Sequence, residues 1–144
     1  MLKIKNYIGG SFLGPKNKKY INNTSPTNGV KYSLIPDSNS VDVSLAIKSA
    51  KIAFKSWGSS TKEHRYGWLM KLADAIDNHA EELVVAESYD NGKPEWLAKS
   101  VDIPRCSANI RFFATALLHF DSDSHSMDGS ALNYTLKQPI GIAG

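Results

Sequence analysis

The chain has 144 residues, of which 42% are hydrophobic and 22% are charged, a composition typical of a globular domain and unlike that of a disordered chain. The formal net charge is only +3 and the lysines are spread along the sequence, so no nucleic-acid-binding face is predicted. A single cysteine excludes an internal disulfide, and neither a membrane-spanning apolar run nor a signal peptide is present, so we expect a soluble, cytoplasmic protein.

Residues 1–38 are expected to be extended and rich in turns. Tyr7–Leu13 places two short apolar strands around a Gly-Gly pair, which supplies the positive φ angles of a tight hairpin. Pro26–Gly29 predicts a second turn, because Asn-Gly is a strong turn signal. Apolar and polar residues then alternate over Val30–Leu34, which predicts a half-buried strand that ends at Pro36.

Apolar residues at helical spacing predict three amphipathic helices after these strands. The first begins at the capping residue Ser40, carries Asp42 in its first turn and ends at Gly58. The second begins at the cap Thr61 and continues as one helix to the Asn91-Gly92 stop.

The third helix is predicted from about Pro94 to Leu118, with a kink or restart at Pro104, whose ring cannot fit a regular helix interior. Cys106 falls on its expected apolar face, where a thiol acts as a small hydrophobic group rather than a nucleophile. The other members of this face are Ile103, Ile110, Phe113, Ala114 and Leu117.

The last part of the chain is predicted to be a polar loop over Asp121–Gly129, a strand over Leu132–Lys137 and the apolar opening of a buried strand at Ile140–Gly144. These elements do not close a sheet by themselves, so their apolar faces would stay unburied. We therefore expect the chain to be one part of a larger structure.

Few residues are candidates for chemistry. No glycine-rich loop joins a strand to a helix, so no dinucleotide-binding fingerprint is present. The four histidines lack the spacing of metal ligands, and neither a metal site nor a catalytic residue is predicted. Arg105 and Arg111 can each pair with a carboxylate of the protein or of a ligand, and spacing alone favours a structural ion pair.

Six segments, taken in order, resemble motifs of the aldehyde dehydrogenase family, although Val30 stands where the family usually has glutamate. The segments are Ile8–Phe12, Ser25–Gly29, Val43–Trp57, Arg65–Ile76, Glu87–Pro94 and Tyr134–Gly144.

Asp102–Arg105 and Asn109–Ala114 resemble more closely the branch that oxidises muconic semialdehydes, which includes the 2-aminomuconic and 2-hydroxymuconic semialdehyde dehydrogenases. In that branch the arginine of the "DIPR" segment is thought to hold the carboxylate of the substrate. The resemblance therefore implies that Arg105 binds substrate, with Arg111 as the second candidate. A forked guanidinium suits a planar carboxylate better than a lysine does.

The resemblance implies an α/β fold, the N-terminal part of the aldehyde dehydrogenase fold, with hairpin strands, three amphipathic helices and the start of the oligomerisation strand. Residues 1–122 would belong to the NAD-binding domain, residues 123–138 would start the oligomerisation arm, and residues 139–144 would lead into the cofactor-binding sheet. The full-length enzyme would be a homo-oligomer, a dimer or a tetramer.

The implied function is the NAD-dependent oxidation of an aldehyde to a carboxylic acid. The expected substrate is a carboxylate-bearing semialdehyde such as 2-aminomuconic semialdehyde, an intermediate of tryptophan catabolism. The resemblance places the catalytic residues and most NAD-binding residues beyond Gly144, so the 144-residue chain alone is expected to be inactive. The choice between NAD and NADP stays open. The alternative is a non-catalytic truncated module that binds a partner subunit through its helices or its final strand.

Overall fold

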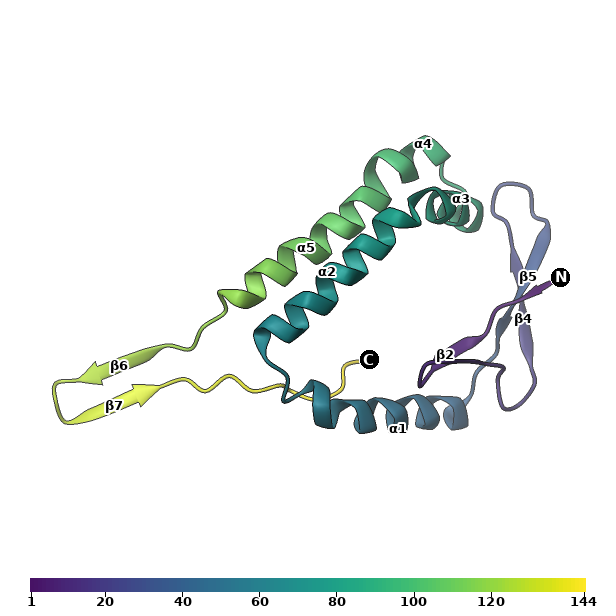
Figure 1. Cartoon of the computed structure of the whole chain (residues 1–144). Helices are drawn as coiled ribbons and strands as arrows, with labels where there is room; N and C mark the ends of the chain where they lie inside the picture. The colour runs from purple at the N-terminus through teal and green to yellow at the C-terminus, as the bar shows by residue number, and fades with distance from the viewer.

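The computed structural model describes all 144 residues, and they form an open frame (Figure 1). Helix α1 (Ser40–Trp57) forms one side of the frame. Helices α2 (Lys62–Asn78) and α5 (Ile103–Leu118) lie together along a second side, and strands β4 (Tyr20–Thr24) and β5 (Lys31–Pro36) stand on the third.

The N-terminal strands form two small sheets. Strand β1 (Leu2–Lys3) pairs in parallel with β5, and β4 pairs with β5 in antiparallel fashion, which makes the order β1-β5-β4. The predicted Gly-Gly hairpin is confirmed, because β2 (Asn6–Ile8) and β3 (Ser11–Leu13) are antiparallel around Gly9 and Gly10, whose φ angles are 61° and 79°.

The strand predicted behind the Asn-Gly turn is confirmed as β5. In the turn itself, Gly29 has a φ of 71° and its N–H donates to the carbonyl of Ser25, while the Ser25 N–H donates to Val30. Strand β4 was not predicted, because its sequence, Tyr-Ile-Asn-Asn-Thr, lacks an apolar–polar alternation. Pairing with β5 is what makes it a strand.

The cap of helix α1 lies one residue before the predicted one. The prediction that Ser40 caps it was wrong, because Asn39 accepts from the Val41 N–H at 3.0 Å and Asp42 accepts from the Asn39 N–H at 3.1 Å, a reciprocal capping box. The other Asp42 oxygen accepts from the Lys16 N–H at 3.0 Å. A buried carboxylate therefore joins the helix to the loop before β4. The helix ends at Gly58, as predicted.

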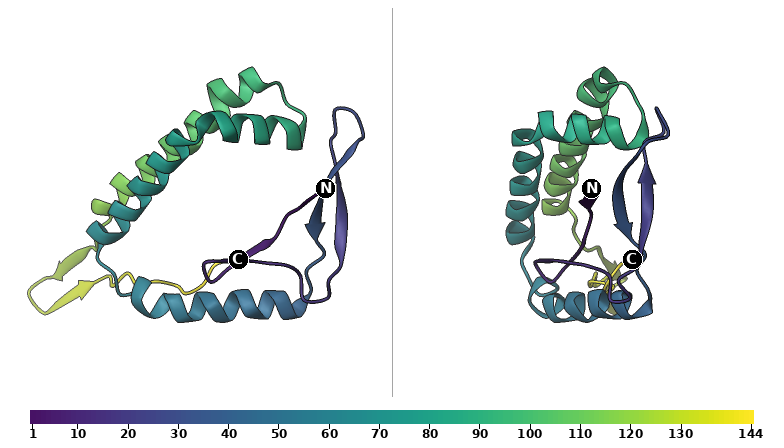
Figure 2. Two further views of the ribbon diagram at one scale, coloured as in Figure 1. Left: turned by 45° about the vertical axis from the view of Figure 1, so that its right-hand side comes forward. Right: turned by 90° about the vertical axis from the view of Figure 1, so that its right-hand side faces the viewer.

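The single helix predicted after Thr61 is two helices, so that prediction was wrong. Thr61 caps α2 as expected, but the helix stops at His79, whose φ of −108° and ψ of 18° leave the helical region. Helix α3 (Ala80–Asn91) then runs in a new direction, at the top of the frame in the right-hand view of Figure 2. The turn lets Val84 pack in the interior, where it is 4% exposed. Helix α3 ends at Gly92, as predicted, with a φ of 79°.

The predicted irregularity at Pro104 is confirmed. Helix α4 (Glu95–Leu97) passes into a π-helical segment, η1 (Ala98–Asp102), and α5 starts immediately before the proline. The Ile103 N–H bonds to the carbonyl of Ala98, five residues earlier. Because proline has no N–H and its ring crowds the preceding turn, the wider π turn accommodates it without ending the helix.

Two alanines allow α2 and α5 to pack closely. Ala73 of α2 and Ala114 of α5 are both 0% exposed. Of the predicted apolar face of α5, Ala114 is buried and Ile103, Ile110 and Leu117 are half-buried, whereas Cys106 and Phe113 are exposed. Close approach of two helices requires small side chains on the contacting faces, so the large aromatic ring is excluded from this contact.

The polar loop predicted over Asp121–Gly129 contains a strand, so that prediction was wrong in part. Strands β6 (Ser124–Met127) and β7 (Ala131–Tyr134) form an antiparallel hairpin, and β7 confirms the first half of the predicted final strand. Residues 135–137 are not in a strand, and the strand opening predicted at residues 140–144 is neither a strand nor buried in this structure. Asp128 and Gly129 form the turn with φ angles of 47° and 74°. The hairpin extends away from the frame, and all of its strand residues are exposed.

Most of the chain's apolar surface is not covered. Only nine of 144 residues are buried, and the apolar ones among them are Ala73, Val84, Ala98 and Ala114. Large side chains such as Phe112 and Trp96 are 64% and 68% exposed. The prediction that these elements leave their apolar faces unburied is confirmed. None of the helices combines the length and apolar character needed to cross a membrane.

Candidate functional site

The structure places Arg105 at the start of α5, beside the loop that follows α3. Asp102 is the last residue of η1 and Arg105 lies three residues later, so the two side chains project from one face of the helix. The turn after α3 brings Lys93 to the same face. Three segments therefore converge here: the end of α3, its following turn, and the junction of η1 with α5.

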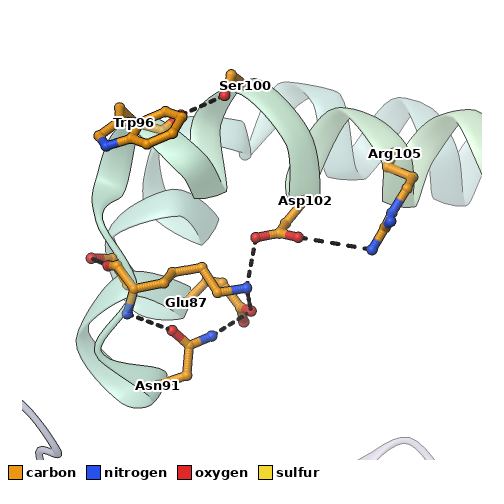
Figure 3. A network of polar contacts seen from close by, with 8 residues as sticks. Glu87, Asn91, Trp96, Ser100, Asp102 and Arg105 are labelled. Carbon is orange, nitrogen blue, oxygen red and sulfur yellow. Dashed lines mark hydrogen bonds and ion pairs between the residues drawn. The ribbon is translucent and has the colours of Figure 1, made fainter.

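Four charged side chains form a connected network at this junction (Figure 3). The Lys93 Nζ lies 2.6 Å from Asp102 Oδ2 and 3.0 Å from Glu87 Oε1. Asn91 completes the network, because its Nδ2 donates to Glu87 Oε1 at 2.7 Å and its Oδ1 accepts from the Lys93 N–H at 2.9 Å. Hydrogen bonds to Asp102 and then to Glu87 raise the pKa of Lys93, so this ammonium stays charged at neutral pH.

Arg105 is held only loosely in this network. Its Nη2 lies 3.9 Å from Asp102 Oδ1, and its side chain is 68% exposed. An exposed ion pair at this distance contributes little stability. The forked donors of Arg105 are therefore free to bind a planar anion, the geometry that the sequence-based prediction requires. That prediction itself stays a prediction.

Arg111 lies two turns further along α5 and does not contact Arg105. Its Nη2 lies 2.8 Å from Asp74 Oδ1 and 2.6 Å from Asp77 Oδ2, both on α2. Hydrogen bonds to Asp77 and then to Asp74 raise the pKa of Arg111. Its donors point at α2, so the geometry favours the structural ion pair, and ligand binding by Arg111 remains an untested prediction.

The Asp77–Arg111 pair predicts a pH dependence of stability. The Ser107 hydroxyl, followed by Arg111, holds the pKa of Asp77 below its ordinary value of 3.8. A lowered folded-state pKa gives stability that is present above the unfolded-state pKa and is lost as the pH falls through the folded-state value. We expect Asp77→Asn to flatten the decline in melting temperature below about pH 4. Circular dichroism melts from pH 2.5 to 7 measure this.

The matched control for this titration is Asp128→Asn, since Asp128 lies in the exposed β6–β7 turn and makes no ion pair. The melting temperature of this control should decline at low pH as steeply as that of the unaltered chain. If the melting temperature of Asp77→Asn declines at low pH as steeply as that of the control, this would contradict the stabilising role of the Asp77–Arg111 pair.

Two of the histidines lie at helix ends: His79 follows α2 and His119 follows α5. Asp102 and Lys93 had no role in the sequence-based prediction. The i, i+3 spacing of Asp102 and Arg105 is a signal that could have paired them. No sequence signal connects Lys93 to Asp102, because the contact depends on the turn at Gly92 and on the π segment.

The aldehyde dehydrogenase family model matches residues 12–144. The chain belongs to the aldehyde dehydrogenase family. This confirms the family predicted from the ordered motifs.

Curated relatives carry the same assignment. The 2-aminomuconic semialdehyde dehydrogenase of Danio rerio is 43% identical over 144 residues, which are 99% of this chain and 29% of the relative. The Homo sapiens protein of that name is 38% identical over 145 residues, covering 100% of this chain and 29% of the relative. The chain thus spans less than a third of the length of these relatives.

Solved structures confirm the predicted fold. A putative aldehyde dehydrogenase from Burkholderia cenocepacia matches with a TM-score of 0.86 at 29% identity, over 93% of this chain and 27% of that chain. PnpE, solved in complex with nicotinamide adenine dinucleotide, matches with a TM-score of 0.86 at 32% identity, over 91% of this chain and 27% of that chain. The α/β architecture described above is therefore the N-terminal part of the aldehyde dehydrogenase fold.

Proposed function

We propose that this chain is the N-terminal part of an NAD-dependent enzyme that oxidises a carboxylate-bearing semialdehyde, such as 2-aminomuconic semialdehyde, to the corresponding acid. The main support for this substrate class is the guanidinium of Arg105. It is exposed, and its one ion pair, with Asp102, is long at 3.9 Å. Similarity to 2-aminomuconic semialdehyde dehydrogenases supports the same class. Arg105 would bind the substrate carboxylate and so orient the aldehyde at the other end of the molecule.

The chain has no glycine-rich turn between a strand and a helix of the kind that binds a dinucleotide. Gly9 and Gly10 connect two strands, and the segment from β5 to α1 contains no glycine. A phosphate-binding turn needs glycines between a strand and a helix. When bound elsewhere in the enzyme, NAD would accept the hydride, and in this proposal the present chain contributes to substrate orientation and to packing.

The test compares the 144-residue chain with the longer enzyme that this proposal implies, called the full-length protein below. We expect the full-length protein to form NADH with 2-hydroxymuconic semialdehyde at a higher kcat/KM than with hexanal, measured at 340 nm. The chain alone should give no aldehyde-dependent signal, because the proposal places the catalytic residues and most NAD-binding residues outside it. Equal kcat/KM for the two aldehydes would contradict the proposed substrate class, and NADH formation by the chain alone would contradict its proposed dependence on the remaining sequence.

We also propose the domain division stated above, with residues 1–122 in the cofactor domain, residues 123–138 in an oligomerisation arm and residues 139–144 leading into the sheet. The exposed β6–β7 hairpin supports the arm, since an exposed strand edge readily pairs with another chain. The same surface supports the alternative, a non-catalytic module that binds a partner subunit. Formation of NADH by the full-length protein distinguishes the enzyme from this module.

A further inference from the structure

We propose that Lys93 and Asp102 act as a positioning pair that keeps the Arg105 guanidinium available to a substrate carboxylate. The inference rests on the proposed function of Arg105 and adds two residues to it. Neither residue is proposed to touch the substrate. Their role is to determine whether Arg105 is paired within the protein or is free to pair with a ligand.

The first step of the argument is how the two oxygens of Asp102 are shared. Lys93 Nζ lies 2.6 Å from Oδ2, whereas the nearest approach of Arg105 is 3.9 Å to Oδ1. Lys93 thus takes the short, charge-assisted contact and Arg105 takes the long one. Asp102 thus contacts Lys93 through one oxygen and Arg105 through the other, and Figure 3 shows the contact between Asp102 and Arg105.

The second step is that Lys93 is fixed in place by its own surroundings. Its N–H donates to Asn91 at 2.9 Å and its carbonyl accepts from the Ser88 hydroxyl at 2.6 Å. Gly92 before it is left-handed, and a Cβ there would lie 2.9 Å from Pro26 Cγ, so this turn is closely packed. The lysine side chain is 25% exposed, and it reaches Asp102 from a rigid base.

The third step concerns the balance of charge. Glu87 and Asp102 carry two negative charges, and Lys93 and Arg105 carry two positive charges. Without Lys93, Arg105 is the only cation left in the network. Asp102, released from its short contact, would then pair closely with Arg105 and compete with a substrate carboxylate for the same donors.

The test uses Lys93→Met in the full-length enzyme, with KM measured for 2-hydroxymuconic semialdehyde and for hexanal. We expect the semialdehyde KM to rise about threefold to fivefold, the scale of a partly exposed ion pair, and more than the hexanal KM does. Removing the competing carboxylate as well, in Lys93→Met/Asp102→Asn, should return the semialdehyde KM toward that of the unaltered enzyme.

The matched control is Lys99→Met, which breaks a similar ion pair, with Glu81 at 2.7 Å, outside the network. It should leave the ratio of the two KM values unchanged. A purely structural role of Lys93 would raise both KM values together, and the double variant would be no better than the single one; either result overturns the proposal. If Arg105→Ala shifts the ratio while Lys93→Met does not, the positioning role fails and the function proposed for Arg105 stands.

Discussion

Replacing Arg105 by alanine in the proposed full-length enzyme is expected to raise the KM for a carboxylate-bearing semialdehyde by about tenfold to a hundredfold. A hydrogen bond to a charged partner contributes about 1.5–3 kcal/mol, and each 1.4 kcal/mol corresponds to a factor of about ten. Hexanal has no carboxylate, so its KM should rise less. Initial rates of NADH formation with both aldehydes measure the difference.

Arg105→Lys separates charge from geometry in the same assay. Lysine keeps the positive charge but loses the two parallel donors, so an intermediate semialdehyde KM is expected. Arg111→Lys is the companion variant, because Arg111 is the second candidate and pairs with Asp74 and Asp77. Equal increases in KM for both aldehydes after Arg105→Ala would remove Arg105 from the substrate site. A selective increase in the Arg111 variant alone would assign the role to Arg111.

Local sequence signals predicted where helices and strands begin and end better than they predicted how these elements pack together. The Asn-Gly turn before β5, the Thr61 cap and the left-handed Gly92 were all visible in sequence, because each depends on the backbone preference of one or two residues. The break at His79 carries no such signal. The apolar stripe continues through it, and the change of direction accompanies the contact of α3 with η1 and the burial of Val84, which is 4% exposed.

The candidate site was predictable to a smaller extent. Arg105 was identified through a family resemblance, and its i, i+3 relation to Asp102 follows from helical geometry. Its pairing state was not predictable, because it depends on Lys93, nine residues before Asp102 and across a turn and a π segment. Spacing placed Cys106 and Phe113 on the apolar face of α5, and both are exposed, because only the small Ala114 of that face is buried in the contact between α5 and α2.

That contact leads to the second large expected effect, the destabilisation of the chain by Ala114→Leu. Ala114 and Ala73 are 0% exposed where α5 meets α2, so a leucine must separate the helices or adopt a strained rotamer. Overpacking of this kind costs about 1–3 kcal/mol. In a chain of this size the melting temperature should fall by about 5–10 °C, measured by far-ultraviolet circular dichroism.

Ala116→Leu is the matched control, because Ala116 lies two residues further along α5 and is exposed. The two variants have the same composition and the same helix propensity change, so any difference between them reports packing. A surface substitution changes stability by less than about 0.5 kcal/mol, and the control should therefore melt within about 2 °C of the unaltered chain. Equal melting temperatures for the two variants would mean that α2 and α5 are not closely packed in solution. The Asp77–Arg111 ion pair would then have no fixed helix contact to stabilise, and the face that presents Arg105 would lack its rigid support.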